Sequence, residues 1–232
     1  MAKQIAYNMD CMEYMKTLPD KAFDLAIVDP PYGASDAIGL VNGKSHAANR
    51  TDYKQFTNEA PPPEYFIELK RISKHQIIWG GNFFGLSGGY ICWNKHGTAF
   101  GEAELAYCSK INSVRVFDYT WNGMIQKNMG ANKEIRIHPC QKPVALYEWL
   151  LRNYAKPGDK ILDTHLGSGS SRIAAYNLGF DFVGCEIDKD YFNAQEERFK
   201  RHTAQIRLFD IVPEPTAEQM KLNDYEPKEV NQ

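Results

Sequence analysis

The pattern of apolar and polar positions along the chain predicts short strands that alternate with helices. Apolar residues recur with helical spacing in three segments, which we expect to be helices: 11–19, 63–73 and 143–155. Six short segments rich in β-branched, aliphatic or aromatic residues are predicted to be strands: 3–9, 23–29, 75–81, 88–95, 103–110 and 113–121. The second of these, "FDLAIVD", is almost continuously apolar, which indicates a strand buried on both faces.

The clearest pattern covers residues 159–188. Here "DKILDTHL" predicts a strand, "GSGS" a tight glycine turn, "SRIAAYNLGF" a helix and "DFVGCEID" a second strand. Strands and helices that alternate in this way are typical of a parallel α/β sheet. We therefore expect a doubly wound, Rossmann-like α/β fold with a mostly parallel central sheet, built as a single domain over residues 1–209.

Composition narrows the class of protein. Of the 232 residues, 43% are hydrophobic, which is enough for a substantial core. No apolar run is long enough to cross a bilayer, and the start of the chain lacks the apolar core of a signal peptide, so we expect a cytoplasmic protein without membrane contact. The five cysteines are scattered without a CxxC pair, and the six histidines lack metal-ligand spacing. Neither a disulfide framework nor a metal site is expected.

The net charge of −2 hides an uneven distribution. Between Arg115 and Lys160, eight basic residues face four acidic ones, a balance of +4 that a polyanion could use, although an ordinary solvated surface would fit as well. From Phe209 to Gln232, six acidic residues and two lysines leave −4, and we expect residues 210–232 to be an acidic, loosely ordered tail. The polar segment 33–63, which ends in three prolines, is expected to be a functional or disordered loop.

The glycine turn predicts a binding site. Gly167 and Gly169 stand where a strand becomes a helix, and glycines there permit a sharp turn and let backbone amides approach a ligand closely. Glu186 follows Gly169 by seventeen residues, at the end of the next strand, where an acidic side chain reaches the hydroxyls of a bound ribose. The turn is shorter than GxGxxG and no P-loop lysine follows it. A nucleoside-containing cofactor is therefore favoured over a dinucleotide or a nucleoside triphosphate.

The strand at 23–29 ends in "DPPY", which we call the elbow, residues 29–32. Pro30 and Pro31 remove two amide donors and fix two φ angles, which stiffens the turn. The Asp29 carboxylate and the Pro30 carbonyl are then held as acceptors at the carboxyl end of a strand, the edge at which open α/β sheets bind ligands. Tyr32 adds a flat ring. Two acceptors beside a stacking surface suit a planar molecule with an NH₂ group, such as the edge of adenine or cytosine.

Together, "DPPY" and "DTHLGSGS" resemble the motifs of the amino-methylating DNA methyltransferases that use S-adenosylmethionine. The segments "NMDCMEYMKTLPDKAFDLAIVDPPYG", "IIWGGNFF" and "HPCQKP" also resemble that family, and the similarity covers roughly residues 4 to 209. The order of motifs, with the elbow before the glycine turn, resembles the β-class. The resemblance implies a site-specific enzyme that methylates the N6 amine of a flipped-out adenine in double-stranded DNA, in a bacterial cell or a phage-infected host.

The resemblance also implies roles for individual residues. The expected catalytic residues are Asp29, Pro30, Pro31 and Tyr32. The expected cofactor-binding residues are Asp10 at the adenine edge, Lys142 near the cofactor carboxylate, Asp163, Gly167, Ser168, Gly169 and Ser170 at the methionine end, and Glu186 at the ribose. In one departure, the family's common "DPF" is "DTH" here, so that Thr164 and His165 replace a proline and an aromatic that packs on the cofactor.

Candidates for reading DNA lie in the loop 33–63 and in the segment 115–137. Their basic residues are Lys44, Arg50, Arg115, Lys133 and Arg136. Both segments could equally be ordinary surface. The chain has little room for a separate recognition domain, which predicts a short target, and it shows no nuclease motif, which favours a solitary modification enzyme over a fused restriction enzyme. Assembly as a homodimer is left open.

Other functions stay open at this point. The same elbow could serve cytosine-N4 methylation, although a leading Asp is the family's usual adenine form. RNA or protein glutamine are further substrate alternatives, and a non-catalytic cofactor- or DNA-binding module is an alternative of another class, disfavoured because the elbow and the glycine turn are both intact. A carbon-5 cytosine methyltransferase would use Cys140 as its nucleophile, but Cys140 lies upstream of the glycine turn, directly before a Lys-Pro helix start.

Overall fold

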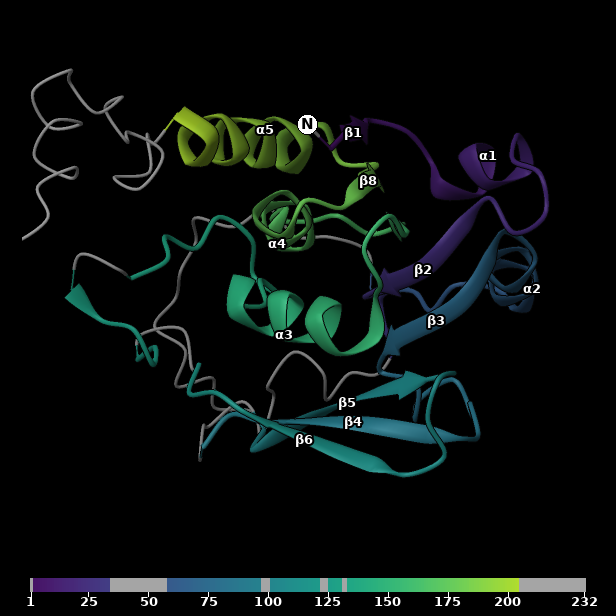
Figure 1. Ribbon diagram of the computed structural model, residues 1–232, viewed down its shortest axis with the longest axis horizontal. Helices are drawn as coiled ribbons and strands as arrows, with labels where there is room; N and C mark the ends of the chain where they lie inside the picture. Colours follow the sequence, from purple (N-terminus) through teal and green to yellow (C-terminus); the bar gives the residue numbers. More distant parts are fainter. Residues whose placement is uncertain (1, 34–57, 97–100, 122–124, 131–132, 205–232) are drawn as a thin grey trace, which may run out of the picture. The chain divides into compact units, whose positions relative to one another are not determined.

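The computed structural model describes residues 2–33, 58–96, 101–121, 125–130 and 133–204, and Figure 1 shows the arrangement of their helices and strands. Lys44, Arg50 and the predicted tail at 210–232 lie outside the described residues. Residues Met1–Phe199 form one compact unit, and Lys200–Gln232 form a second, of which the described part is the end of the last helix.

In the described part of the chain, eight strands form one sheet in the order β1-β8-β7-β2-β3-β5-β4-β6. Their bounds are β1 Gln4–Tyr7, β2 Phe23–Val28, β3 Ser73–Trp79, β4 Gly89–Asn94, β5 Ala103–Cys108, β6 Val114–Asp118, β7 Lys160–Asp163 and β8 Asp181–Cys185. The first five strands in that order run parallel, whereas β5 is antiparallel to both β3 and β4, and β6 is parallel to β4. This mostly parallel sheet confirms the predicted fold class.

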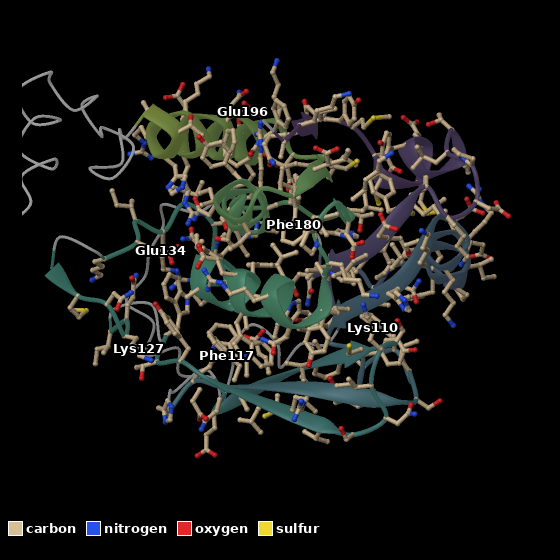
Figure 2. All side chains as sticks on the ribbon, in the orientation of Figure 1. Lys110, Phe117, Lys127, Glu134, Phe180 and Glu196 are labelled. Atoms are coloured by element: carbon tan, nitrogen blue, oxygen red, sulfur yellow. The ribbon has the colours of Figure 1, made fainter. Side chains whose placement is uncertain are left out.

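Helices cover both faces of the sheet, as a doubly wound fold requires (Figure 1). They are α1 Cys11–Lys16, α2 Pro63–Ile72, α3 Val144–Tyr154, α4 Ser170–Leu178 and α5 Lys189–Ala204. Met15 of α1 and Leu69 of α2 belong to one apolar core, whereas Leu150 of α3 and Ala174 of α4 belong to the other. Phe117 of β6, which Figure 2 labels, lies below α3 and packs against Trp149 of that helix. None of the helices within the described ranges combines the length and the apolar character that a membrane span requires.

Strand β2 is buried on both faces, as its continuous apolar run predicts. Leu25 and Ile27 belong to the core under α3 and α4, whereas Ala26 and Val28 belong to the core under α1 and α2. The side chains alternate between the two cores because successive residues of a strand point to opposite faces. Asp29 follows directly, so a strand packed into both cores delivers the elbow to the edge of the sheet.

The structure differs from the sequence expectation at α5, which is absent from the predicted elements. Its buried residues are Tyr191, Gln195 and Arg198, so two of the three are polar. A helix that buries polar side chains lacks the apolar stripe by which amphipathic helices are found in a sequence. The ends of α1 also differ, because the helix stops at Lys16 rather than continuing to Pro19.

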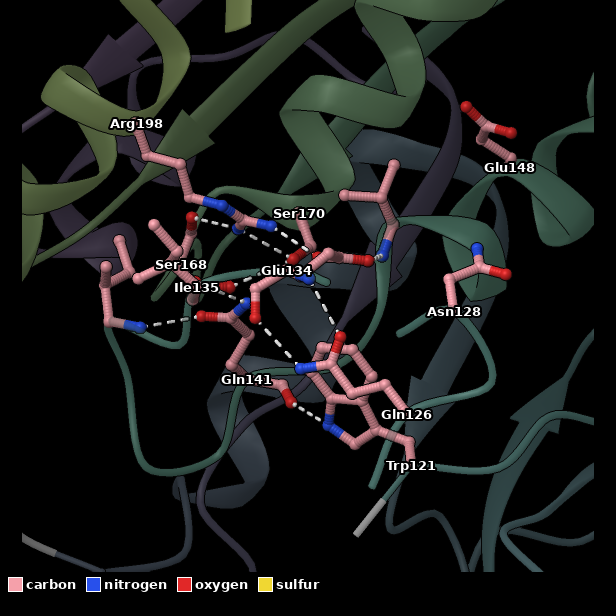
Figure 3. Close-up of polar contacts among 12 residues, drawn as sticks. Trp121, Gln126, Asn128, Glu134, Ile135, Gln141, Glu148, Ser168, Ser170 and Arg198 are labelled. Atoms are coloured by element: carbon pink, nitrogen blue, oxygen red, sulfur yellow. Dashed lines mark hydrogen bonds and ion pairs between the residues drawn. The ribbon is translucent and has the colours of Figure 1, made fainter. Parts of the chain in front are cut away.

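Helix α5 contributes a buried arginine that ties the glycine turn to the segment before α3. Arg198 donates to the carbonyl oxygen of Ser168 at 2.7 Å and to the hydroxyl of Ser170 at 2.9 Å. Its other terminal nitrogen pairs with the Glu134 carboxylate at 2.6 Å (Figure 3). Glu134 also accepts the amide of Val144, the first residue of α3, at 3.0 Å. One guanidinium thereby fixes the glycine turn relative to the start of α3.

Two glutamines hold the chain on either side of Glu134 (Figure 3). Gln126 donates to the Glu134 carbonyl at 2.9 Å and accepts the Glu134 amide at 2.8 Å. The side-chain oxygen of Gln141 accepts the Ile137 amide at 2.9 Å. The backbone carbonyl of Gln141 accepts the indole N–H of Trp121 at 3.0 Å. Beyond β6, side-chain amides thus contribute to holding the described part of the predicted DNA-reading segment 115–137 in place.

We expect Arg198→Met to lower the free energy of unfolding by about 1–3 kcal/mol, because the Glu134 carboxylate, only 21% exposed, then loses this cation. The double variant Arg198→Met/Glu134→Gln should lose less than Arg198→Met alone, since the uncompensated charge is gone. Urea unfolding followed by circular dichroism measures both. A double variant no more stable than the single one would contradict the role assigned to this ion pair.

Candidate functional site

Four acidic side chains come from the carboxyl ends of four adjacent parallel strands. Asp10, Asp29 and Glu186 follow β1, β2 and β8, and Asp163 is the last residue of β7. Parallel strands place their carboxyl ends at one edge of the sheet, which is the edge where open α/β sheets bind ligands. The fold therefore brings the elbow and the predicted cofactor residues to the same edge.

Both oxygens of the Asp29 carboxylate accept hydrogen bonds, one from within the elbow and one from Lys142. Oδ1 accepts the Tyr32 hydroxyl at 2.7 Å, and Oδ2 accepts the ammonium of Lys142 at 2.5 Å. The side chain of Asp29 is 14% exposed and that of Lys142 is 5% exposed, so this ion pair is nearly buried. Pro30 is buried behind it. The result is a carboxylate with a fixed direction at the edge of the sheet.

Lys142 belongs to a chain of four alternating charges, which we call the charge chain: Asp29, Lys142, Glu104 and Lys95. The Lys142 ammonium lies 3.0 Å from one oxygen of Glu104, whose other oxygen pairs with Lys95. Burial alone would lower the pKa of Lys142, but the carboxylates of Asp29 and Glu104 outweigh it and raise that pKa above its usual value. Burial alone would raise the pKa of Glu104, but Lys142 and Lys95 outweigh it and hold that pKa at about 2. The structure thus pairs the ammonium of Lys142 with protein carboxylates.

The glycine turn has a left-handed backbone at two positions. Gly167 has φ +49° and Gly169 has φ +73°, and a Cβ on Gly169 would lie 3.1 Å from the side-chain oxygen of Gln195. Both conditions favour glycine. The Gly167 amide donates to Glu186 at 2.8 Å, which locks the turn to the end of β8. Ser168 and Ser170 of the turn are buried.

Asp163 lies buried beside this turn. Its carboxylate accepts the Ser171 hydroxyl at 2.5 Å and the His165 amide at 3.0 Å. Burial, reinforced by the charges of Asp29 and Glu186, raises the pKa of Asp163 to about 7 in spite of these bonds. A cation bound next to the carboxylate would favour its charged form. The turn therefore suits a ligand that carries positive charge.

Asp10 and Glu186 are fixed by the backbone at the same edge. Asp10 caps α1, where it accepts the amides of Met12 at 2.7 Å and Glu13 at 3.2 Å. The second oxygen of Glu186 accepts the Asp188 amide at 2.9 Å, and burial raises the pKa of Glu186. An ionised carboxylate offers about four acceptor positions, so both side chains keep capacity for the donors of a ligand.

The departure "DTH" has a packing explanation. The Thr164 hydroxyl hydrogen-bonds the Tyr65 hydroxyl at 2.6 Å and the His165 ring at 3.0 Å, and the His165 ring lies edge-on to Tyr65. Burial lowers the pKa of His165 to about 4, so its imidazole is neutral. Both residues are thus anchored on α2, through a hydroxyl partner that a proline and a phenylalanine could not use.

The remaining predicted residues are Cys140 and the basic candidates for reading DNA. Cys140 is exposed, yet desolvation of its thiol, aided by the charge of Asp29, raises the pKa of Cys140 to about 11, which disfavours the thiolate that a covalent mechanism needs. Arg115 lies on β6 and Lys133 is exposed, whereas the guanidinium of Arg136 donates to the Pro139 carbonyl. These basic residues do not join the acidic edge.

Sequence reasoning did not identify Glu104, Lys95 or Phe83. Glu104 had a detectable signal, because it shares one face of β5 with Ala106 and Cys108, both fully buried, and an acid on an inward-facing position calls for a partner. Phe83, whose ring stacks on Tyr32 with centroids 5.2 Å apart, had only the glycine-flanked context "GGNFFG". Lys95 follows β4 without any distinguishing pattern.

The arrangement combines two capacities at one edge. The elbow offers fixed acceptors to an amine, and the glycine turn with its buried acids offers a seat for a cationic, hydroxyl-bearing ligand. Among the described residues, no three His, Cys, Asp or Glu side chains gather as a metal site. Two binding sites at one edge, one for an amine and one for a cationic ligand, suit the transfer of a group from a bound donor to the amine.

Comparisons with known proteins agree with this arrangement. A family model described as DNA methylase, of the N6/N4 type, matches residues 94–197. The Type II methyltransferase M.HinfI of Haemophilus influenzae is 27% identical over 267 residues, which cover 91% of this chain and 73% of that protein. Two solved structures share the fold. The M1.HpyAVI–SAM complex has a TM-score of 0.51 and 22% identity, covering 85% of this chain and 100% of that one. The cytosine-N4-specific PvuII DNA methyltransferase has a TM-score of 0.57 and 12% identity, covering 87% and 91%.

The edge of acidic side chains, the elbow and these matches point the same way: the chain is similar to DNA methyltransferases of the N6/N4 type, and the family model matches it over residues 94–197.

Proposed function

We propose that the protein transfers a methyl group from S-adenosylmethionine to the exocyclic N6 amine of an adenine flipped out of double-stranded DNA. The observation that carries the proposal is the oriented Asp29 carboxylate, held by Tyr32 and Lys142, at the same sheet edge as the acid-lined glycine turn. The leading Asp of the elbow supports adenine over cytosine.

The elbow acts on the amine. An exocyclic amine is a poor nucleophile because its lone pair is delocalised into the ring. When the Asp29 carboxylate and the Pro30 carbonyl accept its two hydrogens, the nitrogen becomes more tetrahedral and its lone pair is directed away from the ring. As the nitrogen gains positive charge in the transition state, the nearby Asp29 carboxylate stabilises that charge. A stacked base cannot reach this pocket, so the base leaves the duplex and Tyr32 replaces part of the lost stacking.

The glycine turn positions the methyl donor. S-adenosylmethionine supplies, when bound, an activated methyl group on a sulfonium. Asp163 would lie near the positive charge of its methionine end, Glu186 would accept hydrogen bonds from its ribose hydroxyls, and Asp10 would meet its adenine edge. The left-handed glycines let the backbone of residues 167–170 approach it closely. The contribution of the protein is alignment of two reactants, which removes much of the entropic barrier.

The methylated nucleoside that the enzyme forms identifies the target base. DNA from a host that expresses the protein should contain N6-methyladenine when it is digested to nucleosides and analysed by mass spectrometry, and sequencing with modification detection should place it in a short target. RNA and total protein from the same cells, and purified enzyme offered each polymer with labelled S-adenosylmethionine, serve as comparisons. If the new nucleoside were N4-methylcytosine, the target base would be cytosine and not adenine. If only RNA or only protein became labelled, DNA would not be the substrate.

We expect Asp29→Asn and Asp29→Ala to lower kcat by about 100-fold or more, because the amine loses the charged acceptor that stabilises the transition state. Both variants should still bind S-adenosylmethionine in calorimetry, because the cofactor contacts come from other strands. Asp20→Asn is the matched control, since the Asp20 carboxylate is 76% exposed and pairs with Arg71 outside the site. Undiminished turnover in Asp29→Asn would eliminate Asp29 as the catalytic acceptor.

Binding of S-adenosylmethionine should depend on pH through Asp163. The pKa of about 7 means that the carboxyl is mostly protonated at pH 6 and mostly ionised at pH 8. A cation binds better to the ionised form, so affinity should rise several-fold as the pH increases through 7, and binding near pH 7 should release protons. Asp163→Asn should remove both effects, as measured by calorimetry in buffers of different ionisation enthalpy. An unchanged pH profile in Asp163→Asn would assign the titration to another group.

A further inference from the structure

The ring of Tyr32 already has a stacking partner in the free protein. Phe83 lies nearly parallel to it, with the ring centroids 5.2 Å apart and the planes 18° apart. Gly80 packs its backbone against the same ring, since a Cβ on Gly80 would lie 2.3, 2.4 and 2.8 Å from three adjacent atoms of the Tyr32 ring. Phe84 contacts the ring edge-on at 6.2 Å. The residue expected to stack on a flipped base is therefore packed on all these sides by its own chain.

Of these neighbours, Phe83 is the one most exposed to solvent. Its side chain is 51% exposed, whereas Phe84 is partly buried against Phe66 and the core under α1 and α2. Gly80 contributes backbone, which is fixed by the hydrogen bond from its amide to the Leu105 carbonyl at 2.8 Å. Phe83 sits in a turn that ends at Gly85, where φ is +63° and no atom lies within 4 Å of a Cβ position. Because the Phe83 side chain is half exposed, it can rotate away from Tyr32 toward solvent without displacing a core residue.

A base does not fit between the two rings as they stand. A planar ring sandwiched between two others needs about 7 Å between the outer rings, which is two stacking distances of roughly 3.5 Å. The observed centroid separation is 5.2 Å. Either Phe83 leaves the Tyr32 ring when a base enters, or the base does not stack there.

The Tyr32 hydroxyl points to the same exchange. It donates to Oδ1 of Asp29 at 2.7 Å, and thus occupies an acceptor position that the incoming amine needs. The Phe83 ring, stacked on Tyr32, takes the place of the ring of a flipped adenine. The Tyr32 hydroxyl, bonded to Asp29, takes the place of an amine hydrogen of that adenine. The free elbow is therefore satisfied by internal substitutes for its substrate.

We propose that Phe83 occupies the seat of the flipped base in the free protein and is displaced from Tyr32 when the base enters. This inference rests on the proposed function and names the residue with which the substrate ring competes. Phe83 is thus a specificity-determining residue of the base pocket, since only a ring that stacks on Tyr32 better than Phe83 does, and also bonds to Asp29, gains entry.

The test compares two substitutions with opposite expected effects. Phe83→Ala removes the competitor, so kcat/KM for unmethylated DNA should rise by about two- to tenfold, the range that an aromatic pair of this geometry commands. Phe83→Trp enlarges the competing ring, so kcat/KM should fall by a similar factor. Ile67→Ala, which truncates a 64% exposed apolar side chain on α2, is the control and should leave kcat/KM unchanged. A value for Phe83→Ala equal to or below that of the parent protein would overturn the proposal.

A second readout follows the ring itself. With 4-fluorophenylalanine at position 83, the ¹⁹F resonance should shift when a duplex containing the mapped target is added, and should stay in place with a duplex that is abasic at the target adenine. Identical responses to the two duplexes would also overturn the proposal. If the parent protein methylates no DNA, the proposed function fails and this inference falls with it, whereas methylation that is insensitive to residue 83 refutes the inference alone.

Discussion

The site depends on one physical constraint, the alternation of two buried lysines with two partly buried carboxylates. Asp29, Lys142, Glu104 and Lys95 come from four different places in the fold: after β2, before α3, on β5 and after β4. Buried ions are tolerated when each one is paired, and removal of one partner leaves the next uncompensated. The charge chain therefore makes the direction of the Asp29 carboxylate a property of the whole sheet, because three other segments must be in place before that carboxylate is held.

The alternating order also has a chemical consequence. A lone lysine beside Asp29 would repel the positive charge that develops on a methylated amine. Glu104 opposes that effect, since its carboxylate lies 3.0 Å from the same ammonium and is kept ionised by two lysines. Lys142 can then orient Asp29 through Oδ2 while Glu104 balances most of the lysine charge, and Oδ1, which the Tyr32 hydroxyl occupies in the free protein, is the oxygen left for the amine. The cofactor side is arranged differently, because no ion pair among the described residues involves the buried Asp163, and burial raises its pKa to about 7.

What the sequence reveals follows from how local each feature is. The elbow and the glycine turn were predictable because φ restriction by Pro30 and Pro31, and left-handed φ at Gly167 and Gly169, are imposed within a few residues. The two-sided burial of β2 was predictable from its continuous apolar run. The pairing of Lys142 with Asp29 joins residues 113 positions apart, and no periodicity in either segment encodes it. Helix α5 escaped prediction for a related reason, because it docks through Arg198 and Gln195 rather than through an apolar stripe.

The same contrast explains why the base pocket is the least predictable part of the site. A pocket for a transient ligand must be stable when it is empty, so its polar groups need partners and its rings need contacts in the absence of substrate. In this protein Tyr32 serves both purposes, with its hydroxyl on Asp29 and its ring against Phe83. Every such internal contact must be exchanged when the base arrives, and its strength is subtracted from the affinity for the base. The free protein is thereby stabilised at the expense of binding, and selectivity increases, because only a ligand that supplies both a ring and an amine recovers what the exchange removes.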